Sequence, residues 1–304
     1  MGGESNPAQG RSNRRKSRMH TVPSSYFEPF AISDPRRRTP AVLRFDRTSG
    51  EGKEVGIYDA EVVRDIYTVY GADGQPDTGI EDKILCDIEG QFCQTRDEVC
   101  ELVQRGTAIG KEHWIGLVKF VALQLLRTPR SFQFMRDLLD SRGTEYDSDA
   151  PQRIMLVLTE RTARRIARMR GVIANNETEY PLLTSDNPVA TWRADYDGQQ
   201  FGVDLRLPNV VVSCPLTPEM LFMAFQTSES LEALSMQAEM DPRKSYQVHI
   251  DMGLLPTAEV KRLNAICLGN AHRYVYANDN SVQLQRFLER KFFGLARTEP
   301  RRGF

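Results

Sequence analysis

The chain has 304 residues, of which 40% are hydrophobic and 27% are charged, and its formal net charge at pH 7 is −1. This composition excludes a globally disordered chain, and the length is enough for one large domain or two small ones with a real core. The near-zero charge predicts no sequence-wide attraction to nucleic acid or anionic lipid, while leaving room for a local basic patch.

The cysteines and the apolar runs favour a soluble protein of the cytoplasm. Five cysteines, with no CxxC and no Cys/His pair at zinc-finger spacing, favour reduced thiols over a disulfide framework or a zinc site. The longest apolar run, residues 115–126, is broken by Lys119 and Gln124 and is too short and too polar to span a membrane. No apolar run follows the basic start, so we expect no signal peptide.

The chain opens with a basic segment and then a β-rich segment. Residues 1–19 contain five basic side chains and no periodic apolar residue, so we expect a disordered basic tail there. A second disordered tail is expected at residues 298–304, which leaves a single domain over residues 20–297. Alternating apolar residues in 41–46, a turn, and residues 53–57 predict a β-hairpin.

The middle of the chain is predicted to be helical, after a short helical turn at residues 24–30 and an ambiguous helix or strand in residues 60–70. Apolar spacing predicts helices over residues 78–103, 114–130, 132–139 and 153–170. Apolar residues lie on almost every side of the helix at 114–130, so we expect it to be buried at the centre of the fold. Pro129 is expected to end or kink it.

The C-terminal half mixes strands and helices, which predicts an α+β fold and not a regular βαβ series. Strands are predicted at residues 180–190, 203–207, 210–214, 220–225, 246–250 and 273–277. Helices are predicted at residues 228–240, 257–271 and 282–295.

The polar end of the central helix is the first candidate site. Gln124, Arg127 and Arg130 come where a buried helix would usually carry leucine, and an unpaired buried cation is costly. Two arginines and a glutamine near one point are suited to gripping a phosphate or carboxylate. The alternative is that the arginines pair with acidic residues of a neighbouring helix, of which Glu81 and Glu89 are the obvious partners.

Three other polar positions are candidates. Ser185, Asp186 and Asn187 lie in a rigid turn before a proline, where they would contact a ligand or satisfy the backbone of the turn itself. His20 lies at the start of the domain, where it would act as a general acid or base or make a structural hydrogen bond. Arg273 lies at the last predicted strand and would bind a ligand or tie secondary structure together.

Several catalytic motifs are absent from the sequence. It contains no P-loop, no GxGxxG, no HExxH and no GxSxG. These absences argue against a P-loop nucleoside triphosphatase, a Rossmann oxidoreductase, a zincin and an α/β-hydrolase. The sequence identifies no set of metal ligands, no cofactor and no oligomeric state.

Six short motifs, taken in order over about residues 20 to 277, resemble those of the bacterial DUF4238 family. That family has no established reaction, so the resemblance implies no activity. It implies that polar motifs far apart in the sequence converge on one centre. Thr21 departs from the aromatic residue usual in the family. The motifs are His20-x-Val22-Pro23 with Tyr26 and Phe30, Glu81 and Glu89, Gln124-x-x-Arg127-Thr128-Pro129, Thr184-Ser185-Asp186-Asn187-Pro188-Val189, Pro215-Leu216-Thr217-Pro218, and Asn264 with Arg273-Tyr274-Val275-Tyr276.

The leading functional hypothesis is a hydrolase of the phosphoesterase type that acts on a phosphate-containing substrate, either a nucleotide or a nucleic acid. His20 would be the acid or base, and Arg127 and Arg130 would hold the anion. Asp186 would orient a water molecule, His20 or an optional metal ion.

Two rival hypotheses use the same residues. In the first, the protein is a non-catalytic effector or sensor of a bacterial defence or stress system, and the pocket recognises a ligand or nucleic acid. In the second, the polar motifs form a buried network that fixes the fold, with Arg127 paired to Glu81 or Glu89.

Overall fold

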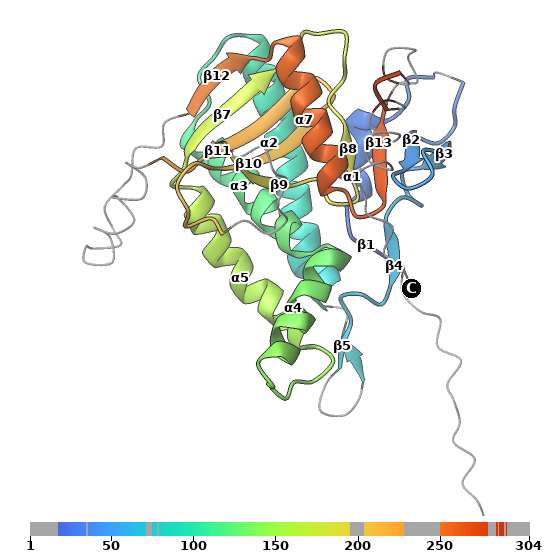
Figure 1. Cartoon of the computed structure of the whole chain (residues 1–304), viewed down its shortest axis with the longest axis vertical. Helices are drawn as coiled ribbons and strands as arrows, with labels where there is room; N and C mark the ends of the chain where they lie inside the picture. The colour runs from blue at the N-terminus through green and yellow to red at the C-terminus, as the bar shows by residue number, and fades with distance from the viewer. Residues whose placement is uncertain are drawn as a thin grey trace, which may run out of the picture.

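The computed structural model describes residues 18–34, 36–70, 75–77, 79–194, 204–227 and 250–278, together with 284, 286–288 and 290 (Figure 1). It has an α+β fold with a hairpin opening, a helical middle and a mixed C-terminal half, which confirms the predicted fold class. The two predicted tails lie outside the described residues, except for Arg18 and Met19. So do the predicted helix 228–240, most of the strand 246–250 and much of the helix 282–295.

The N-terminal segment forms several short strands and helical turns. Strand β1 (Arg18–His20) pairs with β4 (Val62–Arg64), so part of the ambiguous segment at residues 60–70 is a strand. A second short pair joins β5 (Val69–Tyr70) to β6 (Pro76–Asp77). The predicted turn is present as α1 (Ser24–Phe27) and η1 (Glu28–Phe30), and the hairpin is confirmed as β2 (Ala41–Asp46) and β3 (Gly52–Gly56).

The helical middle is built around a buried helix, as predicted. A π-helical turn (Ile80–Leu85) leads into α2 (Cys86–Gln104), and α3 (Lys111–Leu126), α4 (Pro129–Ser141) and α5 (Ala150–Ile166) follow. Most of the apolar residues of α3 are buried, and Trp114 stacks on Phe222 with 4.7 Å between ring centroids.

One boundary of the helical middle was misread from the sequence. Pro129 was predicted to end or kink the central helix, and instead it is the first residue of α4, with Thr128 as the N-cap whose side chain accepts from Ser131 N. Proline is well tolerated at this position because the first N–H groups of a helix have no partner within the helix. The change of direction between α3 and α4 therefore falls at Arg127 and Thr128.

A five-stranded sheet lies against α3, in the order β12-β7-β11-β10-β9. One side chain face of β10 packs with α3, while the other packs with α7, which explains why β10 is apolar at nearly every position. Figure 1 shows α7 and the helices α2 and α3 on opposite faces of this sheet. The elements are β7 (Arg170–Asn175), β9 (Ala190–Arg193), β10 (Val210–Thr217), β11 (Met220–Phe225), β12 (Ile250–Leu254) and α7 (Thr257–Asn270).

A second sheet, in the order β3-β2-β13-β8, joins the two ends of the described chain. Strand β13 (Tyr274–Ala277) lies between β2 and β8 (Thr184–Ser185) and pairs antiparallel with both. The predicted strand at 203–207 is wrong, because the described residues 204–207 form turns. The predicted strand at 180–190 is reduced to β8 and the first residue of β9, and β7 occupies residues that had been assigned to a helix or left unassigned.

Among the helices of the described ranges, none has both the length and the apolar character needed to cross a membrane.

Candidate functional site

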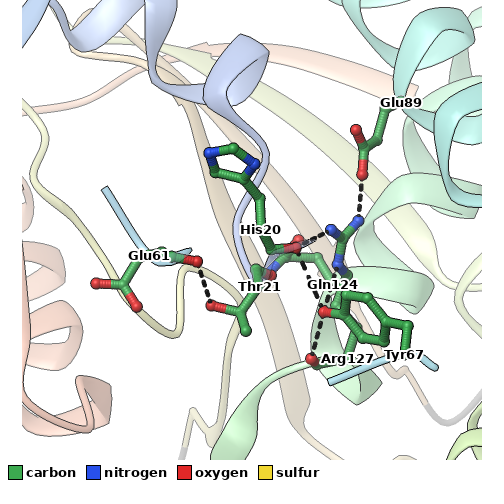
Figure 2. A network of polar contacts seen from close by, with 7 residues as sticks. All are labelled: His20, Thr21, Glu61, Tyr67, Glu89, Gln124 and Arg127. Carbon is green, nitrogen blue, oxygen red and sulfur yellow. Dashed lines mark hydrogen bonds and ion pairs between the residues drawn. The ribbon is translucent and has the colours of Figure 1, made fainter. Parts of the chain in front are cut away.

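The Arg127 side chain is fully buried and every part of its guanidinium group has a partner (Figure 2). Its Nη1 donates to Glu89 Oε1 of α2, Nη2 donates to the carbonyl oxygen of His20, and Nε donates to Tyr67 Oη at 3.2 Å. The Tyr67 hydroxyl donates in turn to the Arg127 carbonyl oxygen at 3.0 Å. We call these four residues the Arg127 network.

The neighbours of Arg127 stabilise the positive charge of its guanidinium group. Burial lowers the pKa of the Arg127 guanidinium, but the neighbouring Tyr67 and Glu89 outweigh burial and hold that pKa above its ordinary value. The side chain of Glu89 is 19% exposed, so the ion pair lies at the edge of the core and not at its centre. Of the two acidic partners expected from the sequence, Glu89 is the one observed, while the side chain of Glu81 lies outside the described residues.

The His20 ring does not face Arg127. Figure 2 shows the imidazole pointing away from the guanidinium, and only the backbone carbonyl of His20 takes part in the Arg127 network. The ring nitrogen Nε2 lies 3.2 Å from the carbonyl oxygen of Tyr58. Burial is the main influence on the imidazole and holds its pKa below the ordinary value. His20 and Arg127 therefore do not present their side chains to one shared space.

Gln124 extends this polar centre towards β1. Its Nε2 donates to the carbonyl oxygen of Thr21 at 2.9 Å, and Thr21 donates through both its N–H and its hydroxyl to the carbonyl oxygen of Glu61. Within the described residues, Gln124 Oε1 has no hydrogen-bond partner. Gln124 thus ties the central helix to Thr21, which is bonded in turn to Glu61.

Glu61 connects Thr21 to Tyr276 of β13, and sequence reasoning did not identify it. Its carboxylate accepts a hydrogen bond from the buried Tyr276 hydroxyl of β13. Burial, followed by the negative charge of Asp186, raises the pKa of Glu61 to about 7. Its φ of 52° lies in the left-handed region, which glutamate rarely adopts, and no local sequence signal announces this conformation.

Asp186 holds the turn that precedes β13. Its carboxylate accepts from the backbone N–H groups of His272, Arg273 and Tyr274 at 2.8, 2.6 and 2.8 Å. Burial raises the pKa of the Asp186 carboxyl, and these amide donors oppose that rise. The arrangement satisfies three backbone donors that would otherwise have no helix or sheet partner.

Ser185 and Asn187 flank Asp186 in the turn that follows β8. Ser185 Oγ accepts from Asn187 N at 3.1 Å, and Asn187 Nδ2 donates to the carbonyl oxygen of Asn270 at 3.1 Å. Asn270 Nδ2 donates back to the carbonyl oxygen of Asn187 at 2.8 Å. Arg273 lies apart, exposed, with its Nε 3.0 Å from Asp46 Oδ2. We call Ser185, Asp186 and Asn187 the turn cluster.

Arg130 lies on a surface hollow, and its Nη1 donates to the carbonyl oxygen of Asn270 at 3.4 Å, the oxygen that Asn187 also contacts. Five basic side chains from four separate segments line this hollow, which has a volume of about 930 Å³. We call it the cationic hollow. Its basic residues are Arg47, Arg64, Arg130, Arg136 and His272.

The arginines of the cationic hollow repel one another. Burial, and after it the charge of Arg47, lowers the pKa of Arg130, so these two guanidinium groups are electrostatically coupled. Arg47 Nη1 donates to the carbonyl oxygen of Ala271 at 3.0 Å, which fixes it at the rim. The side chains of Arg64 and Arg136 make no hydrogen bond or ion pair with the part of the chain that the structure describes. The sequence alone marked only Arg130, because the other residues come from segments that folding brings together.

The described residues contain no group of three or more His, Cys, Asp or Glu side chains placed to hold a metal ion.

Comparison with known proteins gives one match. A family model described as "Protein of unknown function (DUF4238)" matches residues 18–281. No curated protein and no solved structure matches the chain.

Proposed function

The chain belongs to the DUF4238 family, which is defined by its sequence and not by a reaction, and we propose that it binds a phosphate-containing ligand in the cationic hollow. The ligand class is a nucleotide or a nucleic acid. The observation that carries the proposal is the convergence of four arginines and a histidine, from four separate segments, on one open hollow.

Anion binding explains why these charges gather. The whole chain has a formal charge of −1, so four arginines on one hollow are a local concentration of positive charge. Their mutual repulsion costs free energy, and a bound phosphate would relieve it. Guanidinium groups also match the geometry of phosphate oxygens with paired N–H donors. Asp65 and Asp137 share the lining and limit the net charge, which favours a ligand that carries donors as well as phosphate.

The Arg127 network and the turn cluster hold the backbone segments that carry residues of the hollow. Arg127 is fully buried, and each of its three guanidinium nitrogens already donates to a partner within the protein, so its side chain does not reach a ligand in the hollow. The turn cluster holds the backbone of His272, a residue of the hollow, through Asp186. The role proposed for these family motifs is therefore to position the wall of the site.

Removing the two arginines of the hollow that have no described partner is expected to weaken binding without destabilising the fold. For Arg64→Ala/Arg136→Ala, we expect the affinity for ATP and for tripolyphosphate to fall at least tenfold, since a charge-assisted hydrogen bond contributes about 1.5–3 kcal/mol. Isothermal titration calorimetry measures the affinity, and the slope of log Kd against log salt should also become shallower.

The matched control is Arg105→Ala/Arg164→Ala, which removes the same charge. Both residues are more than two-thirds exposed, and each pairs with a glutamate one helical turn away, outside the hollow. This variant should bind as the wild type does. Equal losses in both double variants would show a general charge effect and reject the hollow as the site.

A phosphoesterase step is the second candidate, and the position of His272 favours it. His272 is an exposed imidazole on the wall of the hollow, beside the arginines, where an acid or base would meet a bound phosphate ester. We expect His272→Ala to lose at least a hundredfold in phosphate release from a nucleotide panel while ATP affinity changes less than threefold. If the wild-type protein binds ATP but releases phosphate from no nucleotide of the panel, the phosphoesterase step is rejected and only the binding function is supported.

A further inference from the structure

Helix α4 is shared by two hollows, and only one of them is explained by phosphate binding. The cationic hollow lies between α4 and β4, and a second hollow of about 630 Å³ lies between α4 and α5. Figure 1 shows α4 between these two elements. The second hollow has an apolar floor that includes Met135, Leu138 and Leu158, and we call it the apolar groove.

The apolar groove also carries positive charge. Arg161, Arg165 and Arg206 lie on its walls together with a single acidic residue, Asp204. Asp204 pairs with Arg206 and lies 4.0 Å from Arg165. The two hollows together hold seven arginines and three aspartates, a net of four positive charges on a chain whose formal charge is −1. A mononucleotide would occupy one of these clusters, whereas a polyanion would use both.

Phe134 is the residue common to both hollows. It lines each of them and is 56% exposed, although it is a large aromatic side chain on an amphipathic helix. An aromatic ring between two groups of arginines is the usual arrangement for binding an unpaired nucleic-acid strand, because bases stack on the ring while cations meet the phosphates. In a duplex the base faces are stacked on one another and are not available to Phe134.

We propose that the two hollows form one path for a single-stranded nucleic acid, with Phe134 as a stacking platform where the strand crosses α4. This inference rests on the proposed function, since it requires phosphate binding in the cationic hollow. RNA and DNA share the phosphate and base chemistry that is used here, so the experiment includes both.

Fluorescence anisotropy with labelled oligo(U) and oligo(dT) of 2, 4, 8 and 12 nucleotides tests the path. We expect the 8-mer to bind at least tenfold more tightly than the 2-mer, because only the longer strand spans both hollows. Phe134→Ala should weaken 8-mer binding about tenfold, in line with the contribution of one stacked base. It should leave the affinity for tripolyphosphate, which has no base, unchanged.

Arg161→Ala separates the two hollows. It should weaken the 8-mer at least threefold and leave ATP unaffected, while its neighbour Arg164→Ala, outside both hollows, should change neither. Affinity that does not rise with length, or a Phe134→Ala variant that binds the 8-mer normally, would overturn the path and leave phosphate binding intact. Failure of ATP, tripolyphosphate and all oligonucleotides to bind would reject the proposed function itself.

The apolar floor gives a further decisive outcome. If dodecanoate binds the groove, loses affinity in Leu138→Glu and is not displaced by the 8-mer, then the groove holds an amphiphile and the path is overturned. Displacement of dodecanoate by the 8-mer, at the concentration that saturates anisotropy, would support the path through the groove.

Discussion

Replacing Arg127 with leucine is expected to destabilise the protein by about 3–5 kcal/mol, the usual cost of removing one partner of a buried ion pair. The guanidinium is fully buried, and its loss leaves the Glu89 carboxylate and the His20 carbonyl without their donors. Urea denaturation monitored by circular dichroism measures the change in the free energy of unfolding. Arg127→Lys should lie between the leucine variant and the wild type, because a single ammonium nitrogen cannot reach the three acceptors that the three guanidinium nitrogens contact.

An exposed ion pair provides the control for Arg127. Arg105 and Glu101 pair across one turn of α2, with side chains 71% and 64% exposed, so Arg105→Ala should change stability by less than about 0.5 kcal/mol. The Glu89→Gln/Arg127→Leu double variant should lose less stability than the two single variants lose together, because it leaves no buried charge without a partner. A loss below about 1 kcal/mol in Arg127→Leu would mean that the network does not hold the fold.

Replacing Glu61 with glutamine is expected to change how stability depends on pH. The pKa of Glu61 is about 7 in the folded protein, and its ordinary value is 4.5. Between pH 4.5 and pH 7, the Glu61 carboxyl is therefore protonated in the folded protein and ionised in the unfolded chain. The stabilisation is complete below pH 4.5 and is lost as pH rises through 7. The stabilisation lost amounts to about 3 kcal/mol, because each unit of difference between the folded and unfolded pKa corresponds to about 1.36 kcal/mol.

The measurement is the difference in unfolding free energy between wild type and Glu61→Gln at pH 4.5, 6, 7 and 8. Relative to the variant, the wild type should lose stability steadily over this range, by about 3 kcal/mol in total. Asp186 is present in both proteins, so most of its own titration cancels in the difference. Parallel curves would show that the Glu61 carboxyl titrates normally in the folded state.

Patterns of apolar residues predicted the body of the fold well. Apolar residues on all sides of residues 114–126 correctly indicated a buried helix, and alternation in residues 41–46 correctly indicated a strand. The strand predicted at residues 220–225, which are apolar at every position, is also present. Sequence patterns were less reliable where one residue type occurs at both the end and the start of a helix. Pro129 was taken as a stop, yet proline is equally suited to starting a helix, and only the observed turn at Arg127 decides between these roles.

The candidate site was less predictable because backbone groups and distant segments build it. Helical spacing indicated Arg127 and offered Glu89 as a partner, but the carbonyl of His20 that completes the network cannot be read from a side-chain pattern. The same holds for Asp186, whose three partners are main-chain amides. Arg47 and Arg64 meet Arg130 only through tertiary folding, so the cationic hollow had no signature in the sequence.

The central claim is that the Arg127 network supports the fold while the cationic hollow binds phosphate. The most direct test is the ATP affinity, by calorimetry well below the melting temperature, of Arg127→Lys beside Arg64→Ala/Arg136→Ala. We predict near wild-type affinity with a lowered melting temperature for the first, and at least a tenfold loss of affinity with unchanged melting for the second. The reverse pattern, with ATP binding lost only in Arg127→Lys, would contradict this account and return the binding site to the end of the central helix.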